Sequence, residues 1–232
     1  MDIANLIDID NSILLLLNGG ESMFVDTLML TLTSGLTWIP LYIALLFLVI
    51  KNNEKWSYIL LIISCVGLSL ILSGGVSDHI VKDMVARPRP INEPSLYGII
   101  SPIRGYQAFG YSFYSSHAAN TMSVAVFFIL LVRSRILGIA LVLWAIVNGW
   151  TRIYLGVHYP SDVLMGLLCG IFAGTISYLL FMYIYKKISP KITYVSSQYT
   201  RMGYSITDID MVMNVLMLTL AYVMIKSVII VF

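Results

Sequence analysis

The stretch from residue 162 to 185 reads DVLMGLLCGIFAGTISYLLFMYIY, and its single charged residue, Asp162, stands at its start. An α-helix needs about 20 mostly apolar residues to cross a bilayer, so this stretch predicts a transmembrane helix. The whole chain has the same character, because 59% of its 232 residues are hydrophobic and only 11% are charged. A soluble domain carries about 25% charged residues. We therefore expect a membrane protein, and a net charge of +2 gives no indication of nucleic-acid binding.

Five further apolar segments predict an all-α, polytopic membrane protein with about six transmembrane helices. The six expected spans are 27–50, 57–80, 116–132, 136–153, 162–185 and 210–231. The third and the fourth are short for a bilayer. No Gly/Ser linker and no repeat divides the chain, so we expect residues 1–232 to form a single domain.

The first 20 residues are expected to form an amphipathic helix at the membrane surface. One face would carry Ile3, Leu6, Ile7, Ile13, Leu14 and Leu17, and the other Asp2, Asp8, Asp10 and Asn11. Such a helix lies in the plane of the interface; a disordered tail is the alternative. The segment is unlike a signal peptide, because acidic residues stand where a basic region is expected and its apolar run is short.

The loops between the expected spans alternate between two sides, and their basic residues are divided unevenly. One side carries Lys51, Lys55, Arg133, Arg135, Lys186, Lys187, Lys191 and Arg201, and the other carries Lys82, Arg87, Arg89, Arg104 and Arg152. Three of the second set belong to the candidate site described next, which leaves eight against two. By the positive-inside rule the first side is cytoplasmic. We expect the second side and both termini to face the periplasm or the exterior.

Three segments at the outward ends of these spans carry the residues of a candidate phosphate site. They are 82–90 (KDMVARPRP), 114–117 (YSSH) and 151–162 (TRIYLGVHYPSD). Pro88 and Pro90 exclude a regular helix, which places Arg89 on an extended segment. The guanidinium groups of Arg89 and Arg152 can bind phosphate oxygens in bidentate fashion, and Lys82 adds a point charge. Each cation alone could be an interface anchor, but three of them near two histidines indicate a function.

Two histidines and one aspartate are the candidates for nucleophile, acid and base. His158 and Asp162 are four residues apart, so the carboxylate can accept from one imidazole nitrogen and leave the other free to attack. His117 can protonate a leaving oxygen as a general acid. Ser115 and Ser116 stand at the start of a helix, whose free N–H groups attract an anion. Two histidines and an aspartate could also bind zinc, but the neighbouring cations would repel it.

These segments resemble the three motifs of the type 2 phosphatidic acid phosphatase superfamily, K-x6-R-P, P-S-G-H and S-R-x5-H-x3-D. The matching residues are Lys82, Arg89, Pro90, Ser115, His117, Arg152, His158 and Asp162. Three positions depart from the motifs: Tyr114 stands for Pro, Ser116 for Gly and Thr151 for Ser. The resemblance covers roughly residues 60–185.

The resemblance implies a bacterial-type lipid phosphatase with a helical core, no metal, no other cofactor and a phosphohistidine intermediate. His158 would be the nucleophile, Asp162 its orienting partner and His117 the acid for the leaving group. The phosphoryl oxygens would be bound by Lys82, Arg89, Ser115, Ser116 and Arg152. The substrate would be a lipid phosphate monoester or pyrophosphate at the outer face of the inner membrane. Candidates are phosphatidic acid, phosphatidylglycerophosphate, undecaprenyl pyrophosphate and lipid A.

Other interpretations remain open at this stage. A lipid phosphotransferase would use the same phosphohistidine, and a non-catalytic binder or transporter of lipid phosphates would use the same cations. The chain shows no inverted repeat of the kind that transporters often have. The loop between the first two motifs is rich in aromatic residues: Tyr97, Tyr106, Phe109, Tyr111, Phe113 and Tyr114. We hypothesise that this loop rests on the bilayer and admits a lipid head group between spans; a plain interface anchor is the alternative. No protein partner is indicated.

Overall fold

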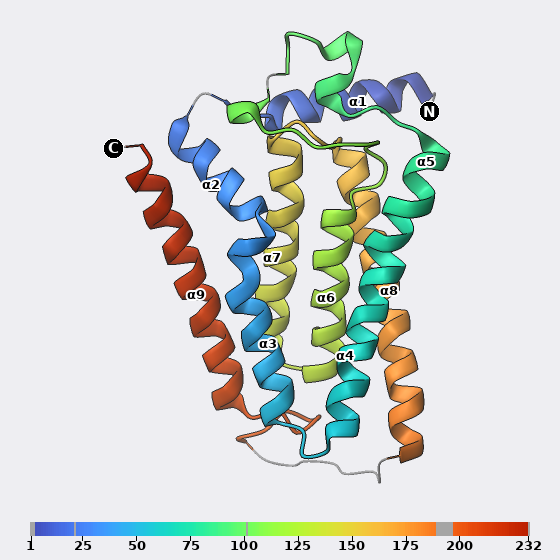
Figure 1. Ribbon diagram of the computed structural model, residues 1–232, viewed down its shortest axis with the longest axis vertical. Coiled ribbons are helices and arrows are strands. Elements are labelled where there is room, and N and C mark those ends of the chain that lie inside the picture. The colour runs from blue at the N-terminus through green and yellow to red at the C-terminus, as the bar shows by residue number, and fades with distance from the viewer. Residues whose placement is uncertain (1–2, 21, 101, 189–196, 232) are drawn as a thin grey trace.

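Long helices running in alternating directions make up the computed structural model, which describes residues 3–20, 22–100, 102–188 and 197–231 (Figure 1). The helices of the bundle are α2 (Met23–Thr33), α3 (Ile39–Lys51), α4 (Trp56–Leu70), α6 (Ser116–Val132), α7 (Arg135–Tyr154), α8 (Pro160–Ile188) and α9 (Ile206–Ile229). Helix α1 (Ile3–Leu17) lies across one end of the bundle. All six expected spans are helical, which confirms the prediction of an all-α, polytopic membrane protein.

The helices that cover the six expected spans differ in length, and some of them are too short to cross a membrane alone. Among the described residues, four helical runs are long and apolar enough to cross a membrane, and these start at Trp56, Arg135, Pro160 and Ile206. The pair formed by α2 and α3 is bent by 67° and can count as a fifth span. Helix α6 is apolar but has 17 residues. It is therefore shorter than a full span needs.

The second span continues beyond α4 through two π-helical stretches, Ile71–Gly75 and Ser77–Val81, into the short helix α5 (Lys82–Val85). Ala86 adopts a left-handed conformation, with φ of 50°, and ends this helix. Pro88 follows and excludes further helix, as the sequence predicts. π-Helical turns are found frequently at functional sites, and the second of these stretches leads directly into the first motif at Lys82.

Helices α6 and α8 pack closely because α8 presents three glycines to the backbone of α6. A Cβ atom at Gly166, Gly170 or Gly174 would come within 2.5 Å of the carbonyl oxygen of Ser115 (the N-cap of α6), Ala119 or Ser123, respectively. Small residues at this spacing let helix backbones approach closely within a membrane. The contact places the N-terminus of α8 beside the N-terminus of α6, and these two helix starts carry parts of the second and third motifs.

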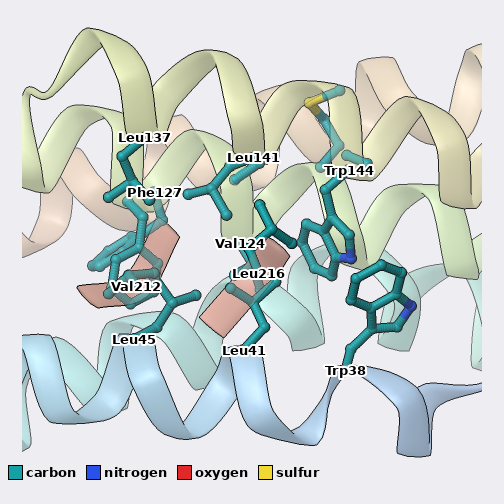
Figure 2. Close-up of a cluster of buried hydrophobic side chains, with 14 of the residues drawn as sticks. Trp38, Leu41, Leu45, Val124, Phe127, Leu137, Leu141, Trp144, Val212 and Leu216 are labelled. Atoms are coloured by element: carbon teal, nitrogen blue, oxygen red, sulfur yellow. The ribbon is translucent and has the colours of Figure 1, made fainter. Parts of the chain in front are cut away.

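An apolar core fills the bundle between α3, α6, α7 and α9 (Figure 2). The residues labelled there are Trp38, Leu41, Leu45, Val124, Phe127, Leu137, Leu141, Trp144, Val212 and Leu216. The basic residues that the sequence analysis places on the cytoplasmic side lie mostly at the end of the bundle opposite α1, where α3 ends and α9 begins. Lys191, which the sequence places in this set, lies outside the described residues.

Helix α1 is helical as expected, but Asp10, expected on its polar face, is buried. Asp10 is only 7% exposed and turns toward the bundle together with the fully buried Leu14. Asp10 is directed there by its polar partners Arg87 and Ser161, described below. Ile7 and Ile13 are exposed at the protein surface, which agrees with an apolar face that contacts the membrane. Asp2 and the side chains of Ile3 and Leu6 lie outside the described residues.

Candidate active site

The three motifs meet at the end of the bundle where α1 lies (Figure 1). Helix α5 and the segment after it carry the first motif, the start of α6 carries the second, and the turn from α7 into α8 carries the third. The structure therefore brings together the residues that the sequence predicts for the site: Lys82, Arg89, Ser115, Ser116, His117, Arg152, His158 and Asp162.

His158 lies in the tight turn between α7 and α8, which Gly156 permits with a φ of 68°. His158 is 2% exposed, its Nε2 atom is 3.2 Å from Nη1 of Arg89, and its Nδ1 atom is 3.7 Å from Oδ2 of Asp162. The second distance is too long for a hydrogen bond. Burial and the positive charges of Arg152 and Arg89 lower the pKa of His158 to about 3, although Asp162 opposes them. The imidazole is therefore neutral at physiological pH, as a nucleophile requires.

Asp162 lies in the first turn of α8 and is completely buried. Its Oδ2 atom accepts a hydrogen bond from the backbone N–H of Tyr159 (2.9 Å), and its Oδ1 atom accepts one from Nη1 of Arg87 (2.7 Å). Its carbonyl oxygen accepts a hydrogen bond from the backbone N–H of Ser115 (3.0 Å), so the second and third motifs are joined directly. The Ser115 hydroxyl caps α6 by accepting from the N–H of Ala118.

Arg89 is 4% exposed, and its guanidinium group is held by neutral acceptors. It donates to the carbonyl oxygens of Gly110 (3.0 Å), Val157 (2.9 Å) and Phe109 (2.8 Å), in addition to its contact with His158. A buried charge that lacks a counterion is energetically costly. The surroundings of Arg89 therefore favour the binding of an anion.

Arg152 at the end of α7 has the same kind of surroundings. Its Nη1 atom donates to the hydroxyls of Thr33 (2.7 Å) and Tyr106 (2.8 Å). Its Nε atom is buried and forms no hydrogen bond within the described part of the chain. Among the described residues, neither Arg89 nor Arg152 forms an ion pair with a carboxylate. Two buried guanidinium groups are thus available to an anion near His158.

Lys82 differs from these arginines because it has an acidic partner. Its Nζ atom lies 2.6 Å from Oδ1 of the exposed Asp78, one helical turn earlier. It also donates to the hydroxyl of Ser116 (3.3 Å). Ser116, which replaces the glycine of the motif, therefore ties the lysine to the start of α6 through its side chain.

Tyr114, which replaces the proline of the motif, is buried and fixes the second span against the start of α6. Its hydroxyl donates to the carbonyl oxygen of Ser73 (2.8 Å), within the π-helical stretch Ile71–Gly75. Its own carbonyl oxygen accepts a hydrogen bond from the hydroxyl of Ser77 (2.7 Å). Both departures from the middle motif thus make contacts between the same two elements.

His117 lies in the first turn of α6, and its Nε2 atom is buried without a hydrogen-bond partner among the described residues. The positive charge of Arg152 lies close enough to His117 and His158 to interact electrostatically with both imidazole rings. In the described residues no group of three His, Cys, Asp or Glu side chains is placed to hold a metal ion.

Sequence reasoning did not assign Arg87, Asp10 or Tyr106 to the site or its immediate surroundings. Arg87 pairs with Asp162, Asp10 pairs with Arg87, and Tyr106 accepts from Arg152. Arg87 lies within the first segment, 82–90, but the sequence offered no reason to give it a partner. For Asp10 the only signal was its spacing of four residues from Leu14, which places both on one helical face.

The aromatic residues of the loop divide into two groups. Tyr97 and Phe109 have exposed side chains, at 84% and 89%, as an interfacial position requires. Tyr106 and Tyr114 instead form hydrogen bonds within the protein, with Arg152 and with Ser73 respectively. The hypothesis that the loop admits a lipid remains a prediction.

Comparison with known proteins agrees with this geometry. A family model described as the PAP2 superfamily matches residues 59–186. The chain belongs to the PAP2 superfamily. This PAP2 chain is 36% identical over 174 residues to a lipid A 4'-phosphatase of Bacteroides thetaiotaomicron, covering 75% of this chain and 77% of that protein. It is 28% identical over 181 residues to the lipid A 4'-phosphatase of Porphyromonas gingivalis, covering 77% and 75%.

A similar fold occurs in a solved structure of this superfamily. The PAP2-type phosphatidylglycerolphosphate phosphatase of Bacillus subtilis superposes with a TM-score of 0.56 at 20% identity, covering 81% of this chain and 90% of that one. Membership of the family confirms the resemblance seen in the motifs. This PAP2 protein is a multi-pass integral membrane protein and a lipid phosphatase.

Proposed function

We propose that this PAP2 protein removes a phosphate monoester from a lipid A molecule at the outward face of the bacterial inner membrane. The observation that carries the proposal is the pair of buried arginines, Arg89 and Arg152, with neutral partners beside a neutral His158. Such a site is charged to receive a phosphate and holds an imidazole ready to attack it. The choice of lipid A is supported by the similarity to two lipid A 4'-phosphatases along three quarters of their length.

The reaction proceeds in two steps. In the first, Nε2 of His158 attacks the phosphorus, the bond from phosphorus to the lipid oxygen breaks, and His117 gives a proton to that oxygen. In the second, His117 takes a proton from water, which attacks the phosphorus and releases inorganic phosphate and free His158. Asp162 stabilises the charge that develops on the imidazole. The phosphoryl oxygens are bound by Arg89, Arg152, Lys82 and the start of α6 at Ser115 and Ser116.

The test is phosphate release by the purified protein in detergent, with a chelator present. The lipid panel contains lipid A bisphosphate, phosphatidic acid, phosphatidylglycerophosphate and undecaprenyl pyrophosphate. We expect the fastest release from lipid A, with mass spectrometry showing loss of the 4'-phosphate. His158→Ala should reduce release by more than about 10³-fold, because it removes the nucleophile. The matched control is His79→Ala, since His79 is the third histidine and is exposed.

Four results would count against the proposal. Release that survives in His158→Ala would exclude the phosphohistidine, and release that stops with chelator would require a metal. Faster release from undecaprenyl pyrophosphate would replace lipid A as the substrate. Product analysis with a lipid alcohol present would show a phosphorylated acceptor if the protein were a phosphotransferase.

A further inference from the structure

The guanidinium group of Arg87 bridges two buried carboxylates on different helices. Its Nη1 atom donates to Oδ1 of Asp162 (2.7 Å) and its Nη2 atom to Oδ2 of Asp10 (2.7 Å). The same group stacks on the ring of Tyr159, with 3.7 Å between its central carbon and the ring centroid. Arg87 is thus fixed by contacts on two edges and one face. Each of these contacts is to a residue of α1 or of the segment that contains His158 and Asp162.

Asp10 makes a second connection to the same place. Its Oδ1 atom accepts a hydrogen bond from the backbone N–H of Ser161 (2.8 Å), in the first turn of α8 directly before Asp162. The Ser161 hydroxyl also donates to Asp10 and accepts from Nη1 of Arg87. The carboxylate of α1 therefore holds both the start of α8 and the arginine that contacts Asp162.

We infer that Asp10 and Arg87 are positioning residues for Asp162, so that helix α1 takes part in orienting the nucleophile. This inference rests on the proposed function, in which Asp162 orients His158. Asp162, which Arg87 contacts, is near Nδ1 of His158, whereas the phosphate would bind on the Nε2 side near Arg89. Their effect should therefore fall on the chemical step and leave the binding of substrate unchanged.

The distance between Asp162 and His158 must be set precisely, and this gives Asp10 and Arg87 their role. Oδ2 of Asp162 lies 3.7 Å from Nδ1 of His158, while its Oδ1 atom is held by Arg87. Because Oδ2 also accepts from the N–H of Tyr159, the two anchors together set the distance from this carboxylate to the imidazole. Misplacement of a reacting group by about 1 Å can cost about 100-fold in rate.

The first test is Asp10→Asn, which keeps the shape of the side chain and removes its charge. We expect kcat to fall by about 10- to 100-fold while KM stays the same. The matched control is Asp8→Asn, because Asp8 is an exposed acid on the same helix and its side chain is not part of this network. Wild-type kcat in Asp10→Asn, or an increase in KM with kcat unchanged, would overturn the inference.

The second test asks whether the residues act through Asp162. In the background of Asp162→Asn, the further change Asp10→Asn should produce no additional loss of kcat, because the carboxylate that it orients is absent. Losses that multiply would show that Asp10 acts independently of Asp162 and would overturn the inference.

The third test does not depend on turnover. Nitrogen NMR of histidine-labelled protein in nanodiscs reports the Nδ1 environment of His158, and His158→Ala identifies its signal. We expect Asp10→Asn to shift this signal and Asp8→Asn to leave it in place. If Asp10→Asn does not fold, Arg87→Lys serves instead, because it keeps the charge but cannot bridge both carboxylates. An unchanged signal overturns the inference. A shifted signal in a protein that releases no phosphate supports the positioning role and rejects the proposed function.

Discussion

Arg87 and Arg89 are separated by one proline, yet their guanidinium groups have opposite surroundings. Arg87 is 23% exposed and is bound by the carboxylates of Asp10 and Asp162. Arg89 is 4% exposed and is bound by backbone carbonyls and by His158. One arginine is therefore neutralised within the protein, and the charge of the other is left for a ligand.

This difference separates residues that stabilise the fold from residues that serve the substrate. A buried ion pair that loses one partner leaves an uncompensated charge, which is strongly destabilising. A buried charge that never had a counterion is already unfavourable in the free protein, and a bound anion offsets its cost. Arg87 belongs to the first class. Arg89 and Arg152 belong to the second, and this is the trade between stability and function that active sites commonly show.

The sharpest way to break the comparison is Arg89→Gln. We expect kcat to fall by about 10²- to 10³-fold, because a preorganised positive charge at the phosphoryl group is lost. The melting temperature in detergent should stay the same or rise, since the variant removes an uncompensated buried charge. Phosphate release and thermal unfolding of the same preparation measure both. A clear fall in the melting temperature would mean that Arg89 is mainly structural.

The reciprocal change, Arg87→Gln, should have a smaller effect on rate and the opposite effect on stability. It leaves Asp162 and Asp10 without their shared partner, which should lower the free energy of unfolding by about 3 kcal/mol. We expect a loss of about 10- to 100-fold in kcat through the displaced carboxylate. The measurement is denaturant or thermal unfolding of Arg87→Gln, compared with Arg89→Gln under the same conditions. If both variants melted at the same temperature, the distinction between the two arginines would be wrong.

Much of the fold follows from the sequence because the membrane restricts it so strongly. Apolar segments of sufficient length must be helical in lipid, and every expected span is helical. The bend near Gly35 within the first span was not predicted. There the indole of Trp38 donates to the carbonyl oxygen of Leu32 (2.8 Å) and the chain turns by 67° between α2 and α3. Such a bend depends on a side-chain contact that hydropathy does not report.

The site was predictable to the extent that its residues stand at the ends of spans. Alternating spans bring those ends to one side of the membrane, so the three motifs had to share a face. The partners of each residue were not predictable in the same way. Arg87 and Asp10 are 77 positions apart. In the sequence Asp10 has the character of a solvent-facing residue, and only the structure shows that Arg87 is its partner. The sequence therefore identifies the cations that the motifs assign to phosphate, but it does not show that Arg87 binds two carboxylates of the protein.

The finest test of the comparison is the titration of His158. Burial and the charges of Arg152 and Arg89 lower the pKa of His158 from 6.5 to about 3. Because the folded pKa is the lower one, this group contributes stability above pH 6.5 that is lost as the pH falls from 6.5 toward 3. Removing one positive charge in Arg89→Gln should raise the pKa of His158 and so weaken the acid-side loss of stability. Asp8→Asn, which changes an exposed charge outside this network, should leave that pKa in place. Histidine NMR between pH 3 and 7 and melting temperatures over the same range measure both effects. Equal midpoints in the two variants would show that the charge of Arg89 does not reach the imidazole, and the assignment of Arg89 to the phosphate side of His158 would then fail.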